Sequence, residues 1–183
     1  MHQERNRLLE RAVAPASEPL TLTETKLYLR VDGSDDDSAI SDMIVAARLA
    51  AEHTLRQSLI TQSWKMVFDE WLPEHVALPM GPVASVTSVI LADREGNSQT
   101  ASSSLYYLNA ARNLLMLDSI LFAFRVEILY VTGYGEASAV PRDIKQAMLA
   151  HIAAMYDMRG MDGNVPIPRQ SLKLYGPYRE VRL

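Results

Sequence analysis

The segment Asp32-Gly33-Ser34-Asp35-Asp36-Asp37 is the densest group of metal-binding side chains in this sequence. Carboxylates at this density suggest calcium, but an EF-hand loop needs glycine at its sixth position and a carboxylate at its twelfth. Counted from Asp32, those positions hold Asp37 and Met43. Carboxylates also suit the positive end of a helix dipole. The run therefore predicts the start of a helix, with a calcium site as the alternative.

Four histidines could act as metal ligands or as general bases: His2, His53, His75 and His151. None has a second histidine three or four residues away, and none lies in an H-E-x-x-H motif. A zinc site would have to assemble from remote positions. We interpret His53 and His151 as ordinary helix residues and predict no metal site.

The motifs of nucleotide-binding and hydrolytic enzymes do not occur in this sequence. It has no G-x-S-x-G, no Walker A and no G-x-G-x-x-G pattern, and Gly133-Tyr134-Gly135 is interpreted as the end of a strand. The absence of cysteine excludes disulfides, thiolate metal sites and cysteine nucleophiles. Serines are frequent, but nothing in their spacing supports a Ser-His-Asp triad. We predict no catalytic residue, no cofactor and no enzymatic activity.

The composition indicates a protein that folds by itself and does not enter a membrane. The chain has 183 residues, 48% of them hydrophobic, and a formal net charge of −4. This hydrophobic content is enough to form a core. The negative net charge gives no indication of general nucleic-acid binding. No apolar run approaches the 18 residues of a membrane-spanning helix. The charged segment 1–11 lacks the apolar region of a secretory signal.

Three helices are predicted from apolar periodicity and capping signals. Thr21 and Glu24 have the spacing of a capping box and open a short helix that ends near Asp32. The acidic run opens a long amphipathic helix extending to about Leu59, and Pro141 opens a third that Gly160 ends. The side chains expected to pack these helices within and between subunits are Ile40, Ile44, Ala47, Ile144, Met148, Ile152 and Met155.

Between the second and third helices, the apolar period changes to the two-residue alternation of strands. Residues 64–68 alternate, residues 93–97 have the composition of a hairpin turn, and 105–108 with 114–117 form a predicted strand pair. The polar residues 98–104 predict a loop. The simplest arrangement keeps the helices together and treats the strands as an inserted antiparallel unit.

The two terminal segments carry different signals. Residues 1–19 begin charged and end in Pro15-Ala16-Ser17-Glu18-Pro19, which predicts a partly helical arm followed by a hinge. The segment 161–183 contains three prolines, no helical period and several basic residues. It is either a solvated, disordered end or an arm that orders on a partner. Aromatic and aliphatic residues among its arginines favour the docking arm.

These patterns predict an α+β fold: a small helical bundle with an inserted antiparallel β unit and an extended C-terminal arm. The expected divisions are an N-terminal arm, 1–19; a helical core, 20–59 with 140–160; the β insertion, 60–139; and the C-terminal arm, 161–183.

Four segments, taken together and in order, resemble a known family. They are Leu22–Asp32 with Asp42–Arg48; Ile60–Trp64; Val131–Gly135 with Val140–Pro141 and the helix up to Arg159; and Leu174–Arg179. Over roughly residues 19–183, the chain resembles the phage head–tail connector (head completion adaptor) family in its longer form, which carries a β insertion. The charged N-terminal extension has no counterpart in this resemblance.

The resemblance implies a structural adaptor rather than an enzyme. Members of the family form twelve-fold rings, bind the portal protein after DNA packaging and present a surface to the next neck, stopper or tail protein. The expected location is the head–tail joint of the virion, with assembly in the host cytoplasm and DNA only as passing cargo. The source could be a phage, a prophage or a gene transfer agent.

The C-terminal arm is the expected docking site for the portal or a neighbouring subunit. The residues assigned to it are Leu172, Leu174, Tyr175, Pro177, Tyr178 and Arg179. Two alternatives remain open at this point: another neck or tail-completion protein, and a small cytosolic ligand-binding protein or enzyme.

Overall fold

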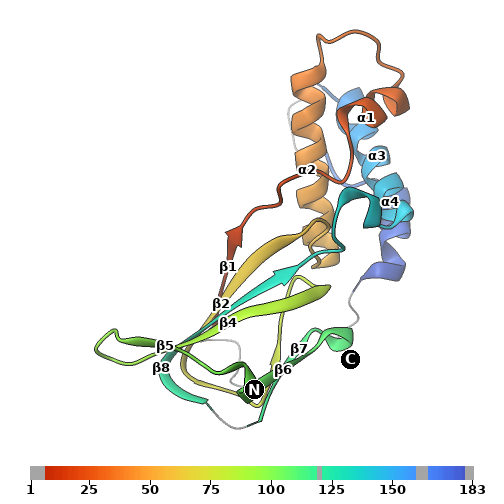
Figure 1. Ribbon diagram of the computed structural model, residues 1–183. Helices are drawn as coiled ribbons and strands as arrows, with labels where there is room; N and C mark the ends of the chain where they lie inside the picture. The colour runs from red at the N-terminus through yellow and green to blue at the C-terminus, as the bar shows by residue number, and fades with distance from the viewer. Residues whose placement is uncertain (1–6, 119–120, 160–164, 180–183) are drawn as a thin grey trace. The chain divides into compact units, whose positions relative to one another are not determined.

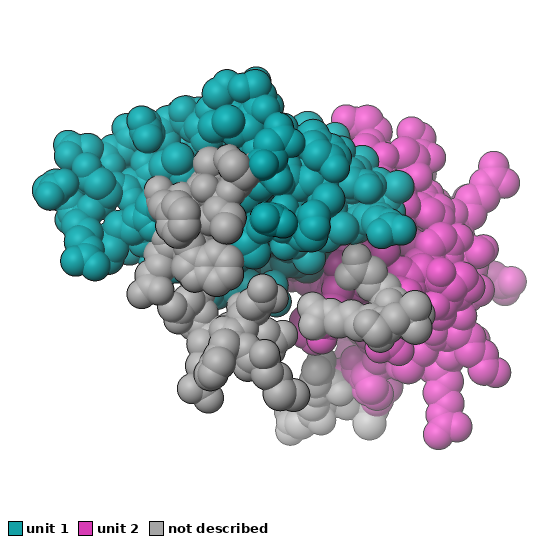
Figure 2. All heavy atoms as spheres, turned by 90° about the horizontal axis from the view of Figure 1, so that it is seen from below, with its two compact units in different colours: residues 1–16, 61–133 teal, residues 17–60, 134–183 magenta. Residues whose placement is uncertain are grey.

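The computed structural model describes residues 7–118, 121–159 and 165–179. The chain folds into two compact units, each assembled from two separate stretches of sequence (Figures 1 and 2). Unit 1 contains residues 1–16 and 61–133, and unit 2 contains residues 17–60 and 134–183. The combination of helices with antiparallel sheets confirms the predicted α+β class.

Unit 1 is built from two antiparallel sheets. The larger has the strand order β1-β2-β8-β4-β5, and the smaller has the order β3-β7-β6 (Figure 1). The strands are β1 Arg7–Val13, β2 Gln62–Leu72, β3 His75–Ala77, β4 Val83–Ala92, β5 Ser98–Thr100, β6 Tyr106–Asn109, β7 Leu114–Leu117 and β8 Leu121–Thr132; the short 3-10 helices are η1 Ser103–Leu105 and η2 Ala110–Arg112.

Strand alternation places one face of the large sheet in the core of unit 1. Val126, Ile128 and Tyr130 on β8 are fully buried and cluster with Leu115 on β7. The phenolic oxygen of Tyr130 donates a hydrogen bond to the carbonyl of Pro79 at 3.0 Å, so its polar end is satisfied inside the core. The predicted hairpin turn at 93–97 is confirmed, since it joins β4 to β5.

Two predictions for unit 1 were wrong. Arg7–Val13 is a strand paired antiparallel with β2, whereas we expected a partly helical arm. Lys65 on β2 pairs with Glu10 at 3.0 Å, and Arg11 stacks 5.2 Å from the ring of Trp64. These cross-strand contacts are non-local and leave no periodic signal in the arm itself. Likewise, Ser98–Thr100 forms β5 inside the expected loop because it completes a hairpin with β4.

Unit 2 is helical. Its elements are α1 Leu22–Leu29, α2 Asp37–Leu55, α3 Arg142–Asp157 and α4 Arg169–Tyr175, with the 3-10 helices η3 Ala137–Ala139 and η4 Gly176–Tyr178. The predicted cap of α1 is confirmed: the Thr21 hydroxyl accepts a hydrogen bond from the backbone N–H of Glu24 at 3.1 Å. Residue 160, the predicted helix stop, lies outside the described residues.

Helix α2 ends at Leu55 rather than near Leu59. Arg56 adopts the left-handed conformation with φ 56°, which stops the helix. The Glu52 side chain then accepts a hydrogen bond from the N–H of Leu59 at 3.0 Å. This contact holds the chain after the turn, and both Leu59 and Ile60 are buried in the core of unit 2.

The C-terminal segment differs most from the prediction of an extended arm. Residues 169–175 form helix α4, and the 3-10 turn η4 follows directly. Tyr175 is 0% exposed and belongs to the core of unit 2. The prolines that suggested an extended chain lie outside α4: Pro168 precedes its first residue, and Pro177 lies in η4.

Candidate interaction surfaces

The seven side chains predicted to pack the helices form the interior of unit 2. Six of them are at most 3% exposed: Ile40, Ile44, Ala47, Ile144, Met148 and Ile152. Met155 is partly buried against the same cluster. Since six of these side chains are already covered by their own chain, they pack within the subunit. The packing of these helices between subunits stays a prediction.

The six residues predicted as a docking arm divide into an inward and an outward group. Tyr175 is buried, and Leu174 and Tyr178 pack partly against the core. Tyr178 is also held by its backbone, whose carbonyl accepts a hydrogen bond from Gln57 Nε2 at 2.9 Å. Leu172 is 42% exposed, and Pro177 and Arg179 are exposed. The structure thus brings the six residues together but leaves only half of them with a well-exposed side chain.

The outward side of the C-terminal segment is basic and partly apolar. Arg169, Lys173 and Arg179 are exposed there together with Leu172 and Pro177, and residues 169–179 contain no aspartate or glutamate. We name this set of five residues the tail patch. A surface of this composition attracts acidic partners through charge and offers apolar area at the contact.

A buried ion pair lies on α2 in unit 2. Arg48 and Glu52 on α2 are 5% and 2% exposed, and Arg48 Nη1 lies 3.1 Å from Glu52 Oε2. Arg48 Nε also contacts Glu18 at 2.7 Å. The two carboxylates raise the pKa of Arg48 against the opposing effect of burial. Because every charge here has a partner, the group is a structural brace rather than a reactive site.

The acidic run 32–37 holds the start of α2 in place. Asp37 pairs with Lys26 at 2.5 Å, while Asp36 accepts hydrogen bonds from Tyr156 at 2.5 Å and Arg159 at 2.8 Å. These donors lower the pKa of Asp36. The carboxylates of Asp36 and Asp37 therefore bind side chains of the same chain, in agreement with a helix start rather than an EF-hand loop.

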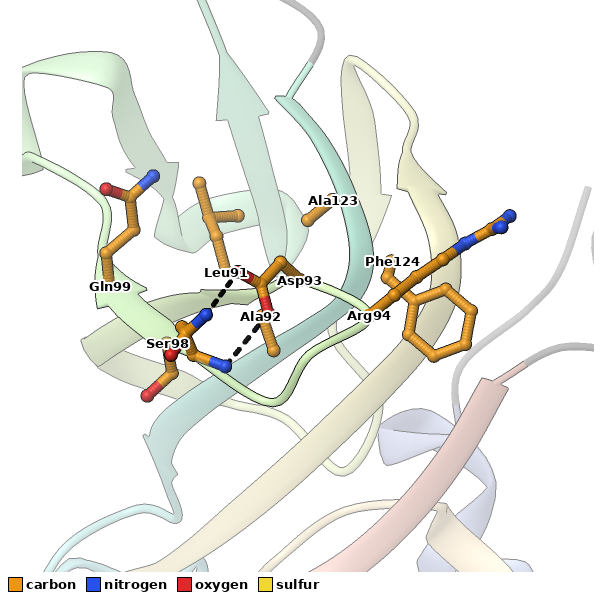
Figure 3. Close-up of a pocket in the computed structure, with 9 residues that line it drawn as sticks. Leu91, Ala92, Asp93, Arg94, Ser98, Gln99, Ala123 and Phe124 are labelled. Carbon is orange, nitrogen blue, oxygen red and sulfur yellow. Dashed lines mark hydrogen bonds between the residues drawn. The ribbon is translucent and has the colours of Figure 1, made fainter.

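A recess that sequence reasoning missed lies beside the β4–β5 hairpin of unit 1 (Figure 3). It is open to solvent, measures about 800 Å³ and is lined by Leu91, Ala92, Asp93, Arg94, Asn97, Ser98, Gln99, Ala123 and Phe124. The guanidinium of Arg94 lies 5.5 Å from the ring of Phe124, which is 46% exposed. Simple strand alternation would place Phe124 on the face of Val126. A register shift between Asp69 and Trp71, opposite residues 122–125 of β8, breaks that alternation, and Ala123 rather than Phe124 packs against the core.

The chemistry available in the recess is that of a contact surface. Asp93 accepts hydrogen bonds from the backbone N–H of Asn97 at 2.9 Å and from its side chain at 2.8 Å (Figure 3). These bonds stabilise the turn and lower the pKa of Asp93. The other polar side chains of the lining, among them Arg94, Ser98 and Gln99, are groups that can bind a partner at a contact.

No metal centre appears in the parts of the chain that the structure describes, since no three His, Asp or Glu side chains gather there in a metal-binding arrangement. His53 and His75 are exposed, whereas His151 is 4% exposed on α3. Burial lowers the pKa of His151; His2 lies outside the described residues. Among the described helices, none combines the length and apolar character needed to cross a bilayer.

Part of the chain matches a known protein family. Residues 19–109 match the model of the phage gp6-like head–tail connector family, a segment that includes α1, α2 and the strands β2 to β6 but not β1. No curated protein matches the chain.

Three solved structures share the fold over nearly the whole chain. They are the neck of an empty gene transfer agent particle computed with C6 symmetry (26% identity, TM-score 0.81), the virion of a native gene transfer agent particle (27%, 0.80) and the neck of a native particle computed with C12 symmetry (28%, 0.79). Each comparison covers 96% of this chain and 97% of the other.

Proposed function

We infer that this chain, whose residues 19–109 match the phage gp6-like head–tail connector family, joins the DNA-filled head of a phage-like particle to its neck or tail by binding beneath the portal protein. Its role as a structural adaptor of a virion neck rests on the family match together with the similarity to neck structures across 96% of the chain. The similarity to neck structures over nearly the whole chain is the main observation in support of the proposal.

The proposed assembly is a closed ring of this chain, with twelve copies as in the adaptors that it resembles. A heterologous contact repeated around an axis closes without a free end, and two of the similar structures are necks computed with cyclic symmetry. On this proposal, the portal lies on one side of the ring and the next neck, stopper or tail protein on the other. DNA passes through the lumen, and a chain with net charge −4 has little tendency to hold it.

The tail patch is the proposed docking surface for the portal. Leu172 and Pro177 offer apolar area, while Arg169, Lys173 and Arg179 supply positive charge beside it. We expect an acidic and apolar groove on the partner. Leu174, Tyr175 and Tyr178, which we also assigned to docking, would act by holding the patch in place because they pack against the core.

Electron microscopy of particles from a strain that lacks the gene tests the location. DNA-filled or leaking heads beside detached tails are the expected result. Intact, infectious, tailed particles would refute the connector function and would favour a ligand-binding protein. Particles with stable heads and an incomplete tail would favour a tail-completion protein instead.

The docking surface is tested by reversing its charge without disturbing the core. Lys173→Glu combined with Arg179→Glu should weaken binding to the purified portal by about tenfold or more, equivalent to about 1.4 kcal/mol, with an unchanged melting temperature. The matched control, Arg112→Glu with Arg142→Glu, reverses two exposed arginines elsewhere and should bind normally. Equal affinity of both variants would refute the assignment.

Deletion of residues 161–183, the test that the sequence alone suggests, does not isolate docking. The deletion also removes Tyr175 and Ser171, both 0% exposed. The loss of these two buried residues would expose the core of unit 2, so a failure to bind the portal could reflect unfolding alone. Charge reversal on the tail patch separates docking from folding.

The absence of enzymatic activity remains part of this proposal. The family match and the similar neck structures suggest it. Assembly would take place in the host cytoplasm before the protein enters the virion.

A further inference from the structure

Strand β1 is an open edge of the large sheet in unit 1. It is the first strand in the order β1-β2-β8-β4-β5, and its only strand partner among the described residues is β2. In an antiparallel ladder, alternate N–H and C=O groups of an edge strand point away from the sheet. The seven residues of β1 therefore present a row of backbone donors and acceptors to a further strand.

The edge lacks several of the usual protections against strand addition. Arg7–Val13 contains no proline, and its single register shift lies at its end, between Arg11 and Val13. Three of its side chains are large, apolar and exposed: Leu8 at 62%, Leu9 at 36% and Val13 at 59%. Soluble proteins normally shorten, bulge, charge or cover such an edge. The strand has the charges of Arg7, Glu10 and Arg11, but no second strand covers it among the described residues, which favours a partner there.

The opposite edge of the same sheet offers complementary groups. β5, residues Ser98–Thr100, ends the strand order and is exposed along its length. β1 carries Arg7 and Arg11 against Glu10, whereas the turn before β5 carries Asp93 and Glu95 against Arg94. The two edges thus match in backbone hydrogen bonding and in the sign of their charge.

We propose that the β1 edge of one subunit pairs with the β5 edge of a second copy, so that the large sheets continue from subunit to subunit around the ring. This inference rests on the proposed ring in the neck. The contact is head-to-tail because β1 and β5 are different edges, which is the interface type that a cyclic ring requires. A two-fold β1–β1 contact would end at a dimer.

The pairing makes a prediction about faces of the sheet. Leu9 lies opposite Met66, and Gln99 lies opposite Leu91; Met66 and Leu91 both belong to the core side. Leu8 lies opposite Val67 and therefore points to the other side. In a continuous sheet, Leu9 of one subunit and Gln99 of the next share a face, whereas Leu8 and Gln99 do not.

Cysteine cross-linking in purified particles tests this pairing, and the native chain contributes no cysteine. Leu9→Cys with Gln99→Cys should give a ladder of covalent oligomers after oxidation or treatment with a short bis-maleimide. The matched pair Leu8→Cys with Gln99→Cys should give several-fold less product. Dimers from Leu9→Cys alone would show a two-fold contact and overturn the proposal, as would particles that contain the double variant without any ladder.

A substitution on the edge provides the second measurement. Leu8→Lys places a charge on the open strand and should lower incorporation into particles by about tenfold or more. The control Leu27→Lys makes the same change at a leucine that is 81% exposed on α1 and should assemble normally. Equal incorporation of the two variants would refute the pairing, while absence of the unsubstituted protein from particles would instead refute the proposed function.

Discussion

Ser171 on α4 donates a hydrogen bond to the carbonyl oxygen of Ala147 on α3 at 2.8 Å, and both residues are 0% exposed. Tyr175, one turn further along α4, lies in the same core as Ala147. The C-terminal segment is therefore part of unit 2, and its buried residues affect stability while its outward residues remain available for docking.

Substitutions at Tyr175 distinguish the contribution of its aromatic ring to stability from that of its hydroxyl. Its phenolic oxygen is buried without a hydrogen-bond partner among the described residues. We expect Tyr175→Phe to leave the free energy of unfolding unchanged or to raise it by up to about 1 kcal/mol. Tyr175→Ala should lower it by about 3–5 kcal/mol through the cavity it creates. Urea unfolding measures both, and a large loss in the phenylalanine variant would contradict this account.

Breaking the Arg48–Glu52 pair should destabilise the protein strongly. Arg48→Met removes the charge that balances Glu52, which is 2% exposed, and should lower the free energy of unfolding by roughly 3–5 kcal/mol. Adding Glu52→Gln to Arg48→Met should restore part of the loss. Lys65→Met is the control, since its partner Glu10 is exposed; a similar loss there would show that burial is not the cause.

His151 should make stability depend on pH. Burial lowers its pKa from the ordinary value of 6.5, so the unfolded chain binds a proton that the folded chain resists. Stability is then complete above about pH 6.5 and declines as the pH falls toward the folded-state pKa. Melting temperatures from pH 8 to 5 should fall more steeply for the native protein than for His151→Gln. His53→Gln, changed at an exposed position of α2, should retain the native slope.

Removal of the N-terminal cap of α1 should destabilise the protein less than the loss of a buried group. Thr21→Ala removes the acceptor for the Glu24 N–H and should cost about 1 kcal/mol of stability. Thr23→Ala changes an exposed threonine inside the same helix and should cost less. Chemical denaturation of the two variants side by side distinguishes loss of the cap from loss of a threonine, and equal costs would argue against the cap.

Local signals in the sequence were sufficient to predict much of the secondary structure. The Thr21–Glu24 spacing predicted a cap that the structure confirms, and the alternation of residues 64–68 predicted a strand, which is β2 in the structure. These features depend on residues close together in the chain, where periodicity and capping chemistry act directly. The connector resemblance is likewise confirmed by the family match.

The tertiary structure decided which residues remain available to partners. Tyr175 and Leu172 were both predicted to be docking residues, yet Tyr175 is 0% exposed and Leu172 is 42% exposed. Likewise, Arg7–Val13 became an edge strand only because β2 lies beside it. Burial and strand pairing depend on contacts between segments distant in sequence, whose position no local pattern records. The sequence by itself therefore determined most of the local elements and the resemblance to connector proteins, while long-range packing determined the surfaces of the protein.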